Sequence, residues 1–380
     1  MIEEETQIIK QKEETGFLSE LSGSLGDLGT FLPHVLGAIS VAGLNPSSIF
    51  SSFGLFYLFC GWFYSIPMAV QPMKAASAAV LVQKLSAGEV AAAGIIIGSI
   101  LLLLGISGLI DKISKITHPG VIGGIQMGLG LSLAILGLKM ISTDLFVGGF
   151  ILVTMLPLLS SRKLPAAVFA VFAGTVLSFM LHPELSLPHV SFGFTWPHII
   201  IPTLADFKNS FFLVALPQLP LTLANAVLVT SAVCNELYGS QAKRVTNKNL
   251  SLTMGIGNLI TAPFGGYTMC HGSGGVSAHY RFGGRTKLTS YIIGTILILI
   301  GLLLGSDGAK LLSLVPESAL GCLLFFSGLD LAQGARKTPD KESFFIVLTV
   351  AAITLAVNPA TAFIGGLLLS KVLEKRIIKI

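Results

Sequence analysis

Long apolar stretches recur along the whole chain, separated by short runs of charged residues, Pro or Gly. Because a helix needs about 20 apolar residues to cross a bilayer, the pattern predicts an all-α polytopic membrane protein with about 14 transmembrane segments. The predicted segments cover residues 20–42, 47–66, 67–83, 88–110, 119–139, 144–160, 164–181, 209–232, 249–265, 266–280, 288–305, 310–330, 342–357 and 359–377.

The third and tenth segments are short and interrupted. Their sequences, "IPMAVQPMKAASAAVLV" and "APFGGYTMCHGSGGVSAHY", each run from a Pro- or Gly-broken stretch into a helix of small residues. Interrupted segments at matching places in two halves are the best sequence indication of a transporter's binding site. Non-helical backbone must be buried or line a wet cavity. We therefore predict two half-helices whose N-termini point at one anion-binding site near mid-membrane.

The longest connection divides the chain into two halves with seven predicted segments each, and an odd number per half implies inverted topology. Short matches between the halves, such as Leu-Pro at residues 32–33 and 216–217, agree with a repeat. The predicted organisation is a cytoplasmic N-terminal tail, a first seven-span repeat, an extracytoplasmic connection and a second seven-span repeat, at residues 1–19, 20–181, 182–208 and 209–380.

Composition supports this interpretation, since only 11% of the residues are charged against about a quarter in soluble domains. With the N-terminus inside, 19 of the 24 Lys and Arg residues fall on the cytoplasmic side, as the positive-inside rule favours. We therefore expect an integral protein of the cell (inner) membrane with both termini in the cytoplasm, and we ascribe the net charge of +5 to its loops rather than to a nucleic-acid partner. The four cysteines lack metal-ligand spacing, so no metal or cofactor is expected.

Lys74 is the one basic residue that these segments place inside the membrane. A charge there costs about 2.5–3.5 kcal/mol on insertion scales, and a cation in the first turn of a helix opposes the helix dipole. An anion is therefore expected nearby, although snorkelling or a structural ion pair is the alternative. Asp27 is the expected counter-ion. We expect that the substrate displaces this pairing or that Asp27 takes up a proton as the anion binds; a purely structural pair is the alternative.

Other polar residues in the interrupted region are candidates for contact with the anion. Gln71 and Gln218 offer amide donors, unless they only join helices. His271 is either a donor or a packed polar residue, and glycines would let free N–H groups approach a ligand closely. The predicted substrate-binding residues are Gln71, Lys74, Gln218, Cys270, His271, Gly272, Ser273 and Gly274, with Thr30, Asn225 and Gly275 as secondary candidates.

Four motifs in order, "GDLGTFLPHVLG", "PMAVQPMKA", "LPQLPLTLANAV" and "CHGSGGVSAHYRFGGR", cover residues 26–37, 67–75, 216–227 and 270–285. The chain resembles, over essentially its whole length, the molybdate transporter branch of the SulP-type sulfate permease group, which is similar to the uracil permease-like fold. The resemblance implies a core domain from segments 1–4 and 8–11, a gate domain from the rest, and uptake of a tetrahedral oxyanion. The wider group usually carries a STAS domain after the last span, whereas this sequence ends at Ile380, as the molybdate branch does.

The alternatives differ in class. Motifs of membrane-embedded enzymes such as HExxH and GxSxG are absent from the sequence, so we expect no enzyme, but a passive anion channel of the same fold stays open. Nucleobase carriers of the related fold use carboxylates in segments 8 and 10, where this chain has Gln218 and the residues Cys270 to Gly272. Molybdate is preferred over sulfate only through the resemblance, and tungstate is also possible. The GxxxG patterns leave a homodimer open.

Overall fold

The computed structural model describes residues 16–159, 166–333, 335 and 340–374, so residues 1–15 of the expected tail lie outside the described part. The first half contains α2 (Phe17–Leu25), α3 (Leu28–Ala42), α4 (Pro46–Tyr64), β1 (Gln71–Pro72), α5 (Lys74–Gln83), α6 (Ala87–Ile106), α7 (Leu109–Ile116), α8 (Pro119–Ile141), α9 (Leu145–Leu158) and α10 (Ala166–Leu181).

The second half begins with a long helix that changes between α, π and 3-10 geometry, followed by a second strand and a second set of helices. Its elements are α11 (Leu204–Ser210), η1 (Phe211–Ala215), α12 (Leu216–Leu221), η2 (Thr222–Val229), α13 (Thr230–Tyr238), η3 (Gly239–Ala242), α14 (Asn247–Thr261), η4 (Ala262–Phe264), β2 (Met269–Cys270), α15 (Ser273–Arg281), α16 (Lys287–Leu299), η5 (Ile300–Leu304), α17 (Gly305–Leu312), α18 (Glu317–Gln333), α19 (Lys341–Ala356) and α20 (Pro359–Glu374).

The predicted all-helical membrane fold is confirmed, with both interrupted segments built as a short strand followed by a half-helix. Each of the fourteen predicted segments contains helix, but only four helices of the described chain are long and apolar enough to cross a membrane on length and composition alone. These are Ala87–Ile106, Pro119–Ile141, Leu204–Ala242 and Lys287–Leu312. The count of fourteen crossings therefore stays a prediction.

Several boundaries differ from the predicted ones. The first segment is two helices that meet at Gly26 and Asp27, which places the Asp27 carboxylate at the start of α3. The helix containing segment 8 begins at Leu204, inside the expected connection, because Thr203 forms a capping box with Asp206. Segment 12 begins at Glu317 and not at residue 310, since residues 305–312 form the separate helix α17.

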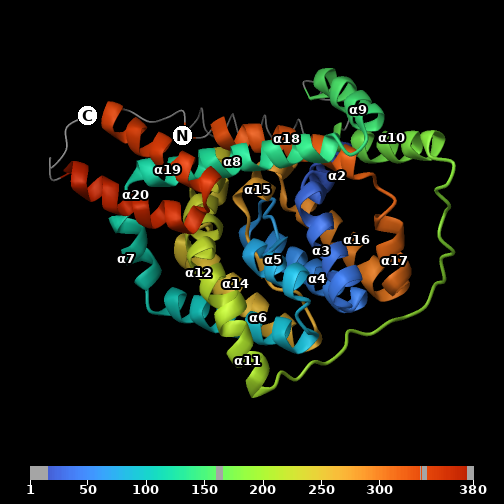
Figure 1. Cartoon of the computed structure of the whole chain (residues 1–380), viewed down its shortest axis with the longest axis horizontal. Helices are drawn as coiled ribbons and strands as arrows, with labels where there is room; N and C mark the ends of the chain where they lie inside the picture. Colours follow the sequence, from blue (N-terminus) through green and yellow to red (C-terminus); the bar gives the residue numbers. More distant parts are fainter. Residues whose placement is uncertain (1–15, 160–165, 334, 336–339, 375–380) are drawn as a thin grey trace.

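The same helix contacts occur twice, with the roles of the first and second halves of the chain exchanged. α4 packs on α16 as α6 packs on α14, β1 pairs with β2, and α8 packs on α18. The pair α19–α20 in the second half corresponds to α9–α10 in the first. Figure 1 shows α8 and α18 side by side along one edge, with α19 and α20 towards one end and α9 and α10 towards the other. We call these six helices the gate domain and the remaining elements the core domain.

Glycines set the closest helix contacts. A Cβ atom built on Gly130 of α8 would lie 2.5 Å from the carbonyl oxygen of Gly328 in α18, and one on Gly328 would lie 2.7 Å from that of Gly130. Gly98 and Gly255 meet in the same reciprocal way between α6 and α14, at 2.9 Å each. Backbones approach this closely only where no side chain intervenes, as is usual between membrane helices.

The connection from α10 to α11 lies across the ends of core helices. The Thr195 amide donates to the carbonyl of Leu302 at 2.8 Å, and the Ile200 amide donates to that of Pro263 at 2.8 Å. The His198 amide donates to the Ser48 hydroxyl at 2.9 Å. Figure 1 shows this connection as a long extended segment that runs from α10 around one side of the molecule to α11. It therefore joins the gate domain to the core domain from outside the helices.

Candidate functional site

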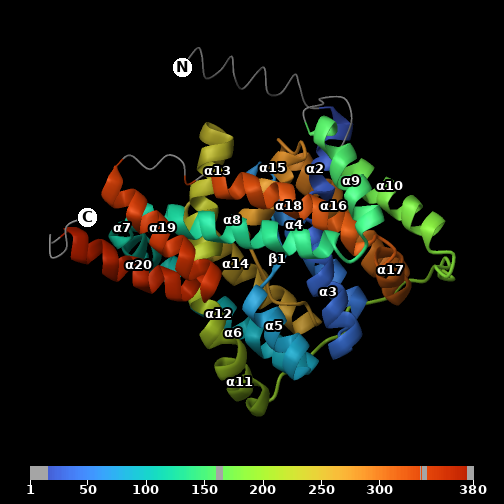
Figure 2. The same ribbon diagram turned by 45° about the horizontal axis from the view of Figure 1, so that its top comes forward.

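The two interrupted segments meet in a two-residue antiparallel ladder in the middle of the core domain. Gln71 stands opposite Cys270 and Pro72 opposite Met269, and the Met73 amide donates to the carbonyl of Thr268 at 3.0 Å. Figure 2 shows β1 in the middle of the molecule, close to α5, which begins two residues after it. The starts of α5, at Lys74, and of α15, at Ser273, therefore lie just beyond opposite ends of the ladder, two residues after Pro72 and three residues after Cys270.

Asn258 of α14 fixes the second strand, although it is not among the predicted site residues. Its side-chain oxygen accepts from the Met269 amide at 3.0 Å, and its side-chain nitrogen donates to the Met269 carbonyl at 2.7 Å. Asn258 is fully buried. A lone amide inside an apolar segment was the available signal, because a buried polar group needs hydrogen-bond partners.

Asp27 lies against Gln71, which corrects its expected pairing with Lys74. The Gln71 side-chain nitrogen Nε2 donates to both carboxylate oxygens of Asp27, at 2.6 and 2.8 Å, and both side chains are buried. The described residues show no ion pair between Asp27 and Lys74. A neutral amide therefore orients the carboxylate, and the Gln71 donor that was expected to face the anion serves Asp27. Thr30, one turn along α3, is also buried and donates its backbone amide to the Asp27 carbonyl at 3.0 Å.

Gln218 is an acceptor at the start of α5 and not the donor that was expected. Its oxygen Oε1 accepts from the amides of Ala75 and Ala76, at 2.8 and 3.2 Å, and its nitrogen Nε2 donates to the Thr222 hydroxyl at 2.9 Å. The first turn of a helix has N–H groups without intrahelical partners, and a side-chain oxygen that accepts from them is a cap. Gln218 therefore occupies two backbone donors of α5.

Among the described residues, no side chain caps the start of α15. Its first intrahelical hydrogen bond runs from the Val276 amide to the Gly272 carbonyl at 3.0 Å, so the amides of Ser273, Gly274 and Gly275 have no acceptor within the helix. The Ser273 hydroxyl donates to the side-chain oxygen of Asn225 at 2.7 Å and is turned towards η2. The two half-helices therefore differ, because only α15 keeps its first turn of amides free of a capping side chain.

Three glycines at this turn each face a different neighbour. A Cβ atom on Gly272 would lie 1.7 Å from the Gln71 oxygen Oε1, and one on Gly275 would lie 2.4 Å from an Asp27 oxygen. A Cβ atom on Gly274 would lie 2.6 Å from a methyl group of Leu133 in α8. Real Cβ atoms do not approach other atoms this closely, so each position needs glycine while its neighbour stays in place.

His271 is a packed polar residue in this structure, which is one of the two alternatives that the sequence left open. Its Nδ1 lies 2.9 Å from the Ala69 carbonyl, so this nitrogen carries the proton, and Nε2 accepts from the Thr253 hydroxyl at 3.0 Å. The imidazole ring is fully buried and stacks on Phe56, with ring centroids 5.5 Å apart. Cys270 is a buried free thiol opposite Gln71.

Lys74 begins α5 and is partly buried. Within the described residues its ammonium group forms no ion pair. No group of three or more His, Cys, Asp or Glu residues suited to a metal ion occurs in the described ranges. The region thus offers one lysine and one free turn of backbone amides, which is an arrangement suited to an anion.

Comparison with known proteins identifies the family. A family model described as "Molybdate transporter of MFS superfamily" matches residues 19–133 and 210–331. Molybdate transporter 2 of Arabidopsis thaliana is 31% identical over 94% of this chain and 88% of its own length. The chain belongs to the molybdate transporter family. This family consists of transporters, so the expectation that the protein is not an enzyme is confirmed.

The fold of this molybdate transporter family member matches solved structures outside the family. The transmembrane domain of the cyanobacterial bicarbonate transporter BicA superposes with a TM-score of 0.58 at 20% identity, over 91% of this chain and 97% of that domain. Murine Slc26a9, an anion transporter solved in the inward-facing state, gives 0.61 at 15% identity, over 96% of this chain and 69% of that one. These matches confirm the fold expected from the resemblance to sulfate permeases. The description of the family model names the MFS superfamily instead.

Proposed function

We propose that the protein is a secondary transporter that takes up molybdate across the cell membrane by alternating access, with both termini in the cytoplasm. The observation that carries the proposal is the uncapped first turn of α15, which begins just beyond one end of the β1–β2 ladder, while α5 begins with Lys74 just beyond the other end. The relationship to a protein named molybdate transporter 2 supports molybdate as the anion.

The proposed binding mode uses backbone and one charge. The amides of Ser273, Gly274 and Gly275 carry the positive end of the α15 dipole, and the glycines let an oxyanion approach the backbone. Lys74 supplies a full positive charge from the other half-helix. Because Gln218 occupies the Ala75 and Ala76 amides, Lys74 is the contribution of α5, and α15 supplies the hydrogen bonds.

Asp27 is the proposed proton-coupling group. Its carboxylate faces Gly275, so an anion on the α15 amides would lie near a like charge. Two unit charges 4 Å apart at an effective dielectric constant of 20 repel by about 4 kcal/mol. A proton on Asp27 removes this repulsion, so anion binding and protonation favour each other. Asp27→Asn should therefore transport with a much weaker dependence on external pH, whereas uptake by the natural protein should rise as pH falls. An unchanged pH profile in the Asn variant would contradict the coupling.

Access is proposed to alternate through movement of the core domain, which holds both half-helices, against α8 and α18 of the gate domain. The Nε atom of Arg281 at the end of α15 lies 3.1 Å from an Asp330 oxygen on α18, so an ion pair joins the two domains in this structure. If α15 moves along α18 when access changes from one side of the membrane to the other, this ion pair has to break.

The test is uptake of labelled molybdate by purified protein in proteoliposomes, with tungstate, sulfate and uracil as competitors. Lys74→Gln should abolish uptake, whereas Lys139→Gln, at an exposed lysine of α8, should not. Tungstate should compete strongly, and sulfate at equal concentration should not. Strong competition by sulfate would favour a sulfate transporter, and uptake that never exceeds equilibrium under a proton gradient would favour a channel.

A further inference from the structure

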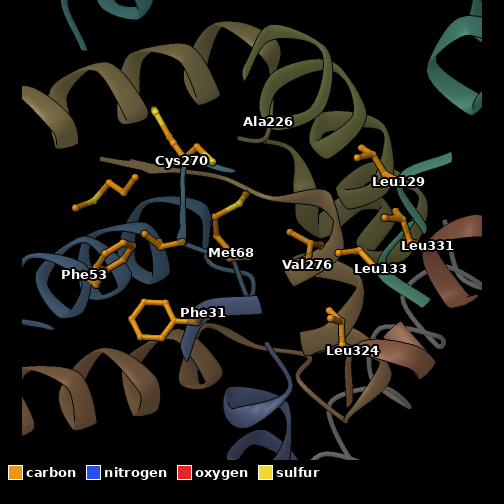
Figure 3. Close-up of a cluster of buried hydrophobic side chains, with 14 of the residues drawn as sticks. Phe31, Phe53, Met68, Leu129, Leu133, Ala226, Cys270, Val276, Leu324 and Leu331 are labelled. Atoms are coloured by element: carbon orange, nitrogen blue, oxygen red, sulfur yellow. The ribbon is translucent and has the colours of Figure 1, made fainter. Parts of the chain in front are cut away.

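Leu133 of the gate helix α8 packs against Gly274 in the free turn of α15. A Cβ atom on Gly274 would lie 2.6 Å from the Leu133 methyl carbon Cδ1, and the next nearest side chain, Leu331 of α18, would lie 3.9 Å away. Leu133 is 6% exposed. Figure 3 shows Leu133 pointing towards Val276, which belongs to the next turn of α15, with Leu331 close by.

The surroundings of this turn are polar on the side of the core domain and apolar on the side of the gate domain. Gly272 and Gly275 face oxygens of Gln71 and Asp27, whereas Gly274 faces Leu133. An oxyanion held by these amides meets polar groups of fixed position on one side. On the other side it meets a side chain that can neither donate nor accept a hydrogen bond, and such a side chain discriminates between anions only through the space it fills.

We infer that Leu133 is a specificity-determining residue that limits the size of the anion bound at α15. The inference rests on the proposed function and adds the residue that separates tetrahedral dianions of equal charge. Molybdate is larger than sulfate and close in size to tungstate, so a bulkier residue 133 penalises molybdate and tungstate together and sulfate less. A smaller residue has the opposite effect on the ratio.

The test is a size series at residue 133, with molybdate uptake measured in proteoliposomes against sulfate and tungstate as competitors. The ratio of the sulfate inhibition constant to the molybdate KM should fall in the order Leu133→Ala, natural protein, Leu133→Phe. A single methylene in a pocket changes discrimination by about tenfold or more, so each step should change the ratio by at least about tenfold. The ratio for tungstate should stay constant throughout.

Leu129 supplies the matched control. It lies one turn earlier on α8 and is also 6% exposed, but it is not among the atoms nearest to Gly274. Leu129→Ala and Leu129→Phe should leave the sulfate ratio within about twofold of the natural value. If the Leu129 series changes the ratio as much as the Leu133 series, or neither does, Leu133 has no special role. If Leu133→Phe does not fold, the change in the sulfate ratio between the natural protein and Leu133→Ala still tests the inference. Natural protein without molybdate uptake would instead overturn the proposed function.

Discussion

The cap that Gln218 places on α5 can be tested by removing its acceptor and keeping its shape. Gln218→Met fills the same space but leaves the amides of Ala75 and Ala76 without the partners that now lie at 2.8 and 3.2 Å. A buried donor without a partner costs about 1–3 kcal/mol, and loss of a helix cap costs about 1 kcal/mol. The longer bond to Ala76 is the weaker of the two and adds less than the bond to Ala75. Together the two losses should lower the free energy of unfolding by about 2–4 kcal/mol.

The assay is unfolding of the purified protein by SDS in bicelles, followed by circular dichroism. Gln126→Met is the matched control, because Gln126 is buried in α8 and its side chain takes part in none of the hydrogen bonds identified in the described part of the chain. That substitution should change the free energy of unfolding by less than about 1 kcal/mol.

Gln218→Glu separates capping from ligand binding. A carboxylate keeps the acceptor and suits the N-terminus of a helix, so the variant should stay as stable as the natural protein. It should nevertheless lose molybdate uptake, because the new charge lies beside the first turn of α5 and would repel a dianion. The reasoning is refuted if Gln218→Met keeps its stability but loses anion binding, since that result means that Gln218 donates to the ligand instead of capping α5.

Two further predictions concern neighbouring contacts. Gly272→Ala should abolish molybdate uptake, because its Cβ would lie 1.7 Å from the Gln71 oxygen and would displace that side chain. Gly149→Ala, whose Cβ would meet nothing within 4 Å, should transport normally. Normal uptake in both variants would show that the position of Gln71 is irrelevant. The ion pair between Arg281 and Asp330, 3.1 Å apart, joins the two domains, so Arg281→Asp and Asp330→Arg should each change the transport rate several-fold. The double variant should restore the rate. A double variant no better than the worse single variant would exclude a direct pairing.

The sequence sufficed to locate the two interrupted segments that the structure pairs at β1 and β2, because their signals are local. Lys74 stood out as a charge in an apolar run, and Pro and Gly interrupted two segments at matching places. The partners could not be inferred, since Asp27 meets Gln71 across 44 residues of sequence and Gln218 meets Ala75 across 143. Composition does not encode which of several buried polar groups will be neighbours after folding.

Two further features could not be settled from the sequence. For His271 the sequence left open a donor to the anion and a packed polar residue, and the ring bonds to Thr253 and the Ala69 carbonyl. Most of the short helix α7 falls between the fourth and fifth predicted segments, although its apolar residues recur at helical spacing.

The connection between α10 and α11 acts as a tether of defined length. From Ser191 onwards it is fastened to core helices, first by the Ser191 hydroxyl, which donates to Asp307 at 2.8 Å. Only residues 183–190 separate this first attachment from His182, directly after the end of α10. Fully extended, a stretch of this length spans about 30 Å. The length of the tether therefore sets an upper limit on the separation between the end of α10 in the gate domain and the first attachment on the core domain, and a shorter connection would lower that limit.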